Sequence, residues 1–270
     1  MLKDVFVYCR PLITFLLCCR ILMAQSHFPY IFPSDRGHNS HTPDHWLLGL
    51  KSVDNETQKC YIRKITYLKA RKPLFHEYLL VEIVHTGSVQ ASLAVTERVP
   101  EKNDGYSTKQ AVSPSVYGRV AANDTVRIVG GTGISELPSH NKLSELQFDA
   151  NELPLLNLAI LLNVVRKHAQ YYDVWKYQCY WYANTVYQSV QDLFKSRKDH
   201  VEPAFSKHRG KVLLGLPQRK DSVGAIIGEY NAAMEDIRKE KIKQTTARLA
   251  DEKKVCSWIP LLYYMFTFLL

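Results

Sequence analysis

The spacing of apolar and polar residues predicts four β-strands in the first half of the chain. Alternating, β-branched and aromatic residues favour strands over 60–68, 76–84, 89–96 and 125–129. The turn His85-Thr86-Gly87-Ser88 joins the second strand to the third, which predicts a β-hairpin. A polar loop is expected from Glu97 to about Asn123.

Helical spacing of apolar residues appears at three places further along. The segment 154–171 is apolar on most of its circumference, so it should be a central element of the core, and Pro154 suits its first turn. The segments 178–194 and 223–249 also repeat apolar residues every three or four positions. We therefore predict an α+β fold in which an antiparallel sheet packs against two core helices, followed by a long C-terminal helix.

Length and composition indicate how this fold is divided. A chain of 270 residues with 46% hydrophobic content can bury one sizeable core and a small appendage. The predicted divisions are an apolar N-terminal stretch and irregular leader at 1–58, an α+β core at 59–195, a basic linker at 196–221, an amphipathic basic helix at 222–254 and an apolar tail at 255–270.

No metal or cofactor is expected from the sequence. His38, His41 and His45 fall in the leader, where no strand or helix signal would fix the geometry that metal ligands need. The run Gly130-Gly131-Thr132-Gly133 lacks the Lys and Ser/Thr of a phosphate-binding loop, so we interpret it as a turn.

The formal net charge of +9 is concentrated towards the C-terminus. Between Arg238 and Lys254 basic residues exceed acidic residues by four, without interleaved aromatic residues. This pattern favours a solvated helix face and excludes nucleic acid from the expected partners. The apolar face of the same helix either packs on the core or pairs with another helix, so a helix-mediated oligomer stays open.

Both ends of the chain are apolar. The run 11–19 has the length of a signal peptide, but cleavage after Ala24 would place Leu22 where a small residue is needed, and translation from Met23 would remove the run. At roughly 1.5 Å per residue, the tail 255–270 reaches about 24 Å, which is shorter than a hydrocarbon core of about 30 Å. Three interpretations of this tail stay open: membrane contact, packing on the core and a mistaken chain end.

Cysteine usage favours a reducing compartment. The six cysteines show no repeated spacing, so a disulfide framework is not expected. We expect a cytoplasmic protein, with membrane association through the tail as the alternative and secretion less favoured.

Cys179 is the residue that the sequence favours as a chemical centre. It stands at the start of the predicted helix 178–194, where unpaired amides and the positive end of the helix dipole stabilise a thiolate. The thiolate is the form of cysteine that attacks a substrate. Free cysteines also commonly fill volume in a core, so a structural role is the alternative.

The order of elements around Cys179 points in the same direction. The segment YQCYWYA, residues 177–183, heads a helix and follows both an apolar helix and a strand that opens with His76. Over about residues 60–195 this arrangement resembles the circularly permuted papain-like thiol hydrolases and acyltransferases, including the lecithin:retinol acyltransferase-like proteins. The resemblance implies that Cys179 is the nucleophile and His76 the general base.

The sequence departs from that family next to the nucleophile. Gln178 stands where the family often has Asn, and Tyr180-Trp181 replaces Glu-His. In the family a third polar group lies on the strand after the histidine strand, which here offers Gln90 as the candidate, with Ser92 nearby and His85 at the turn. Such a group would hold the second ring nitrogen of the histidine.

Our leading hypothesis is a cysteine-dependent hydrolase or acyltransferase that acts on an amide or ester of a small molecule, peptide or lipid, with Tyr180 and Trp181 as pocket aromatics. The alternative is an inactive scaffold of the same fold whose aromatic residues Tyr177, Tyr180, Trp181 and Tyr182 bind a partner. Hydrogen-bond contact between Cys179 and His76 would favour the enzyme, and a sealed apolar surrounding would favour the scaffold.

A membrane-tethered adaptor is the third hypothesis, and it is tested by fractionation. If the apolar tail attaches the protein to membranes, the full-length chain should sediment with them, and a chain ending at Lys254 should not. Equal membrane association of the two chains would contradict a role for the tail.

Overall fold

The computed structural model describes residues 31, 39–71, 76–86, 91–101, 120–129, 137–172, 178–194, 198–201 and 221–268, without the side chains of 39, 120, 198–201, 221 and 251–268. The chain divides into two compact units, Met1–Ile226 and Ile227–Leu270. The first unit contains the sheet and the helices that cover it.

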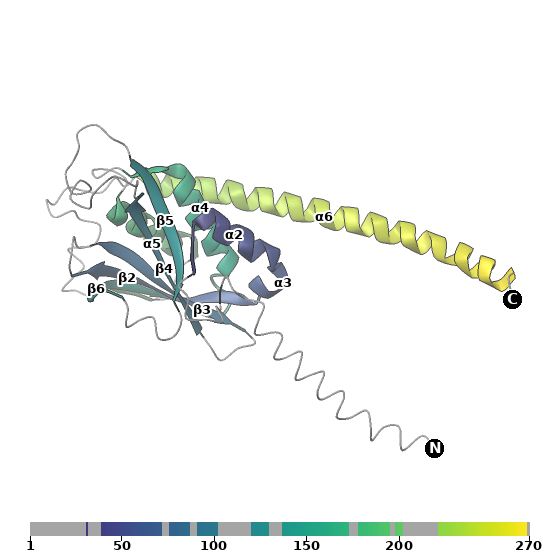
Figure 1. Ribbon diagram of the computed structural model, residues 1–270, viewed down its shortest axis with the longest axis horizontal. Helices are drawn as coiled ribbons and strands as arrows, with labels where there is room; N and C mark the ends of the chain where they lie inside the picture. Colours follow the sequence, from purple (N-terminus) through teal and green to yellow (C-terminus); the bar gives the residue numbers. More distant parts are fainter. Residues whose placement is uncertain are drawn as a thin grey trace, which may run out of the picture. The chain divides into compact units, whose positions relative to one another are not determined.

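Within the described residues, seven strands form one antiparallel sheet in the order β1-β5-β4-β3-β2-β6-β8, and β7 pairs with β5 beside it (Figure 1). The strands are β1 (Asn39–His41), β2 (Cys60–Ala70), β3 (Glu77–His85), β4 (Ala91–Pro100), β5 (Val120–Val129), β6 (His140–Gln147), β7 (Tyr171–Tyr172) and β8 (Lys198–Val201). The pairing of Leu79 with Thr96 and Val84 with Ala91 confirms the predicted hairpin.

The described helices are α2 (Pro43–Ser52), α3 (Asp54–Thr57), α4 (Leu155–His168), α5 (Cys179–Phe194) and α6 (Asp221–Phe268). In Figure 1, α2, α4 and α5 gather on one side of the sheet. Eight side chains of α4 are buried, as its apolar circumference predicts, and α5 packs on β3 and β4. The predicted α+β class, with an antiparallel sheet, two core helices and a C-terminal helix, is confirmed.

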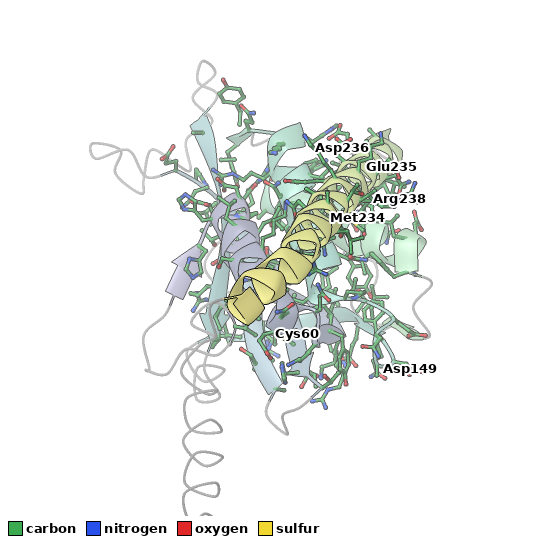
Figure 2. The ribbon with its side chains drawn as sticks, turned by 90° about the vertical axis from the view of Figure 1, so that its right-hand side faces the viewer. Cys60, Asp149, Met234, Glu235, Asp236 and Arg238 are labelled. Carbon is green, nitrogen blue, oxygen red and sulfur yellow. The ribbon has the colours of Figure 1, made fainter. Side chains whose placement is uncertain are left out.

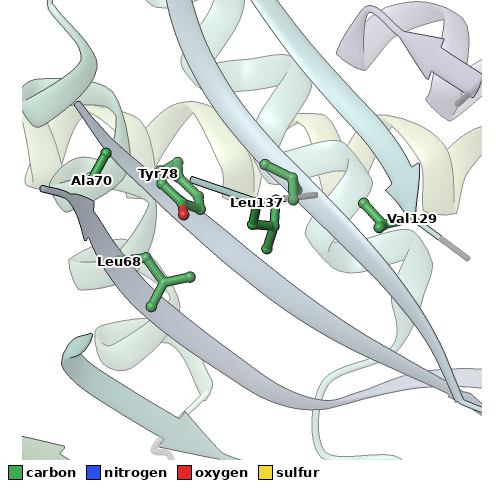
Figure 3. Packing of buried hydrophobic residues seen from close by; sticks show 6 residues of the cluster. Leu68, Ala70, Tyr78, Val129 and Leu137 are labelled. Carbon is green, nitrogen blue, oxygen red and sulfur yellow. The ribbon is translucent and has the colours of Figure 1, made fainter. Parts of the chain in front are cut away.

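The two faces of the sheet are both buried near its centre. On the helix side, the ring of Tyr67 in β2 stacks on Tyr187 of α5, with ring centroids 5.5 Å apart. Because side chains alternate along a strand, the next residue, Leu68, points to the other face. There Leu68, Tyr78 and Leu137 belong to a second apolar cluster (Figure 3).

The interpretation of residues 1–58 as an irregular leader is wrong for its described part. Pro43 opens α2, and Trp46 and Leu50 on one side of that helix have no exposed surface. This helix was missed because it is short and begins within a stretch of polar and proline residues. His41 and His45 lie in β1 and α2, whereas His38 and the Gly130–Gly133 run lie outside the described residues.

Two other strands lie where no strand was predicted. β6 pairs with β2 although its apolar residues are confined to Leu143 and Leu146, a pattern too sparse for a prediction from periodicity. β8 falls inside the segment predicted as a basic linker and pairs with β6.

The predicted boundary between a basic helix and an apolar tail does not interrupt α6, which continues for 48 residues. In the second unit, Arg238 Nε donates to Glu235 Oε2 at 2.9 Å, one turn earlier (Figure 2). Within the described part of the chain, no helix has the length and apolar character to cross a membrane. The predicted membrane contact of the tail stays a prediction.

A buried ion pair joins β4 to β5 beneath α5. Arg98 and Asp124 face each other in the strand register, and neither side chain has exposed surface. The guanidinium donates to both carboxylate oxygens, at 2.6 and 2.7 Å, and to the carbonyl of Ala169 at 2.8 Å. It also lies 4.9 Å from the centroid of the Trp181 ring. The pair therefore connects two strands, the end of α4 and the first turn of α5.

Removing one partner of this pair should destabilise the first unit strongly. We expect Asp124→Asn to lower the free energy of unfolding by about 3–5 kcal/mol, because it leaves a buried guanidinium charge without its counter-charge. Urea denaturation followed by tryptophan fluorescence measures this change. Arg63→Gln, which breaks the exposed pair with Glu82, is the matched control and should cost below about 1 kcal/mol. Equal losses for the two variants would contradict the role given to the buried pair.

Candidate active site

Cys179 is the first residue of α5, as the sequence predicts. Its side chain is buried, with 6% of its surface exposed. The first amides of a helix have no partner within the helix, so the backbone around Cys179 presents the positive end of the helix dipole. The buried stripe below it holds the helix on the sheet, with Ala183, Val186 and Val190 fully covered.

His76 stands immediately before β3, at the end of the sheet where α5 begins. Its carbonyl accepts a hydrogen bond of 2.8 Å from the amide of Ala70, which continues the pairing of β2 and β3 by one residue. Cys179 interacts with its side chain and contributes to raising the pKa of the imidazole. The structure therefore brings together the two residues that the sequence paired as nucleophile and base.

Glu97 holds the opposite edge of the same ring. Its Oε2 lies 2.8 Å from Nε2 of His76. Because an imidazole has two ring nitrogens, Nδ1 is left for the thiol. The three side chains follow one another from Cys179 through His76 to Glu97, which is the order of nucleophile, base and orienting group that a thiol catalytic triad requires.

The alternation of side chains along β4 puts Glu97 in this position. Thr96 Oγ1 lies 2.7 Å from the hydroxyl of Tyr182 on α5, and the Arg98 guanidinium lies 5.3 Å from the centroid of the same ring. Both neighbours of Glu97 therefore point to α5, and Glu97 points to the other side of the strand. There it meets His76, which also stacks on Tyr78 with ring centroids 6.0 Å apart.

The charges of this group favour a protonated His76. Burial alone would lower its pKa, but the hydrogen bonds to Cys179 and Glu97, and the negative charges of both, raise the pKa of His76 to about 10. Burial alone would raise the pKa of Glu97, but the hydrogen bond and charge of His76 lower it. At neutral pH the arrangement is therefore an imidazolium held between two acidic groups.

These shifts determine how the site contributes to stability. The pKa of His76 is raised in the folded chain, so its contribution is complete below about pH 6.5 and is lost as pH rises through about 10. The pKa of Glu97 is lowered, so its contribution is present above the ordinary glutamate pKa and is lost as pH falls through the lowered value.

The candidates named for the third group do not occupy that position. Gln90 lies outside the described residues. The hydroxyl of Ser92 donates to the carbonyl of Ile31, and His85 lies 3.3 Å from the carboxylate of Glu56. Glu97 was missed because the predicted strand ended at Thr96, which assigned Glu97 to a loop. A signal was present in the sequence: a carboxylate follows the predicted strand 89–96 directly. In the permuted papain-like family that the sequence resembles, the third group lies on the corresponding strand.

The predicted pocket aromatics are parts of the core. Trp181 has 2% of its surface exposed, and its indole Nε1 donates to Ser222 Oγ at 3.2 Å. Tyr182 has no exposed surface, and Tyr177 lies outside the described residues. Tyr180 is buried next to Cys179 in the sequence, with Lys69 Nζ 4.8 Å from the centroid of its ring. The described aromatics therefore do not form the exposed binding face that the scaffold hypothesis requires.

A polar cavity of about 320 Å³ lies at the end of α4 and beside β5. Its lining includes Arg166, Lys167 and Gln170, and none of the three site residues. No group of three or more His, Cys, Asp or Glu side chains within the described residues could hold a metal ion.

No family model matches the chain, and no curated protein or solved structure matches it either. The geometry of Cys179, His76 and Glu97 is therefore the basis for assigning a function.

The carboxylate of Glu97 should set the protonation of His76. We expect Glu97→Gln to lower the pKa of His76, because the amide removes a negative charge from Nε2. Two-dimensional NMR of the imidazole nitrogens over a pH titration measures it. Glu82→Gln, which changes a carboxylate bonded to Arg63 on β3, is the control and should leave His76 unchanged. A His76 titration unaltered by Glu97→Gln would contradict the proposed contact.

Proposed function

We propose that this protein is a cysteine-dependent acyl-transfer enzyme, a hydrolase or an acyltransferase, that cleaves an amide or ester through a thioester on Cys179. The observation that carries the proposal is the His76 ring, whose Nε2 lies 2.8 Å from Glu97 Oε2 and whose pKa is raised by both Cys179 and Glu97. A histidine with a structural role can pair its two ring nitrogens with any polar groups. Here the two partners are a thiol at the start of a helix and a carboxylate, which are the groups that cysteine-dependent acyl transfer needs.

The reaction follows from these positions. The Cys179 sulfur attacks the carbonyl carbon, and the carbonyl electrons move onto its oxygen to give a tetrahedral intermediate. When the intermediate collapses, the His76 imidazolium gives its proton to the leaving amine or alcohol, and a thioester remains. His76, now neutral, takes a proton from water or from an acceptor alcohol or amine, which attacks the thioester and releases Cys179.

Glu97 acts through His76. Its carboxylate fixes the ring by accepting from Nε2, which keeps Nδ1 directed at the sulfur, and it stabilises the imidazolium. The order of the histidine strand, the carboxylate strand and the cysteine helix is consistent with the resemblance to permuted papain-like enzymes. The substrate class that we propose is an amide or ester of a small molecule, peptide or lipid.

The scaffold hypothesis is not supported by a specific observation. It predicted a sealed apolar surrounding for Cys179 and an accessible aromatic face, whereas the thiol has a histidine partner and the described aromatics are buried.

The selective reactivity of Cys179 tests the proposal, and Cys60 provides an internal control. Cys60, labelled in Figure 2, is the first residue of β2. Burial, together with the charge of Glu56, raises the pKa of Cys60 to about 12, so this thiol stays protonated at neutral pH. We expect iodoacetamide at pH 7 to label Cys179 well before Cys60, as measured by peptide mass spectrometry. His76→Ala should slow the labelling of Cys179 on the order of 10²-fold, because it removes the base that holds the proton of the thiol as an imidazolium.

The contrary result would be equal rates at Cys179 and Cys60, or a rate at Cys179 that His76→Ala leaves unchanged. Leu48→Ala, at an exposed position on α2, controls for the handling of a variant protein and should leave the labelling of Cys179 unchanged.

A further inference from the structure

The polar cavity of the first unit takes no part in the reaction proposed above, because none of the three site residues lines it. Its volume of about 320 Å³ lies at the small end of the range of about 300–1,000 Å³ that small-molecule sites occupy. Three segments supply most of its lining: Thr42 before α2, Arg166 and Lys167 in the last turn of α4, and residues 121–124 of β5. Most of the lining side chains are polar or charged, so the cavity fits a small polar ligand.

The α4 side of this cavity is cationic and contains a donor without an acceptor. Nε of Arg166 lies 3.4 Å from Oδ1 of Asp44, but its Nη1 is buried and has no hydrogen-bond partner among the described residues. A buried donor without a partner costs free energy, which an acceptor on a ligand would recover. The planar guanidinium matches a carboxylate in charge and shape, and Lys167 adds a second positive charge. This side of the cavity therefore favours the carboxylate of a ligand.

The side of the cavity next to β5 is acidic. Glu101 follows β4, and its amide donates to the carbonyl of Ala121 at 2.9 Å, which fixes its backbone beside β5. Asp124 is the other carboxylate of the lining, but both of its oxygens accept from Arg98, so its charge is already compensated. Glu101 is therefore the carboxylate of this cavity that favours a positive group on a ligand.

We propose that this cavity is a binding site for a free amino acid, a small ligand that carries a carboxylate and an ammonium group at once. The carboxylate binds Arg166 and Lys167, and the ammonium group binds Glu101. A dianion such as phosphate fits less well, because two carboxylates belong to the same lining. The assignment concerns residues outside the candidate active site, so it does not depend on the acyl-transfer function.

Ligand-observed NMR with the full chain tests this proposal. Saturation-transfer spectra are recorded with a mixture of the common L-amino acids, with the corresponding amino-acid amides, which lack the carboxylate, and with inorganic phosphate. We expect transfer to one or more amino acids and none to their amides. Isothermal titration then gives the Kd of the amino acid with the strongest transfer. Binding of no amino acid, equal binding of an amino acid and its amide, or tighter binding of phosphate would overturn the proposal.

Charge variants test whether the amino acid binds in this cavity. Lys167→Glu reverses the charge of an exposed lining side chain and should raise the Kd about tenfold or more, and Arg166→Gln should raise it by a similar factor. Lys51→Glu is the matched control, since Lys51 is exposed in the last turn of α2 and does not line the cavity. It should leave the Kd within about twofold, because solvent and salt screen a distant surface charge.

The exposed position of Lys167 makes its variant the decisive one, because the substitution disturbs no buried contact of the fold. An unchanged Kd in Lys167→Glu would overturn the assignment of the amino acid to this cavity. An equal rise of the Kd in Lys51→Glu would overturn it as well, because it would show that only the net charge of the chain matters.

Discussion

The buried ion pair between Arg98 and Asp124 is the constraint on which the candidate site depends. The two residues are partners in the register of β4 and β5, and the guanidinium also binds the end of α4 and lies against two aromatic rings of α5. A charge pair without exposed surface tolerates little displacement, because any separation leaves an uncompensated charge in the core. It therefore fixes the height of the first turn of α5 over β4.

The position of α5 over β4 determines which side chains Glu97 can contact. With Thr96 and Arg98 directed at α5, the residue between them has to point to the other side, and a shift of the register by one residue would exchange these directions. The site therefore forms at the end of strands β3 and β4, where α5 begins. His76 stands at the end of β3, where it interacts with Cys179 at the start of α5 and is hydrogen-bonded to Glu97 on the opposite side of β4.

The sequence was sufficient for the parts of the site that have local signals. Cys179 was recognisable from its place at the start of an amphipathic helix, and His76 from its place at the start of a β-rich segment. Glu97 was not, because Glu97 and Arg98 have the polarity of a loop, and Asp124 likewise made β5 appear to begin at Thr125. The end of β4 and the first half of β5 stabilise each other through the buried pair of Arg98 and Asp124. A pairing between two distant segments cannot be recognised from the sequence of either segment alone. The strand β7 was missed for a similar reason, since it has two residues and exists through its pairing with β5.

The central claim is that Cys179 carries an acyl group during a reaction assisted by His76. Peptide mapping by mass spectrometry after brief treatment with p-nitrophenyl acetate at neutral pH tests it most directly. The account predicts one acetyl group per chain on Cys179, removable by hydroxylamine and absent from a Cys179→Ala chain. Acetylation confined to lysine residues, or spread equally over Cys60 and Cys179, would contradict it.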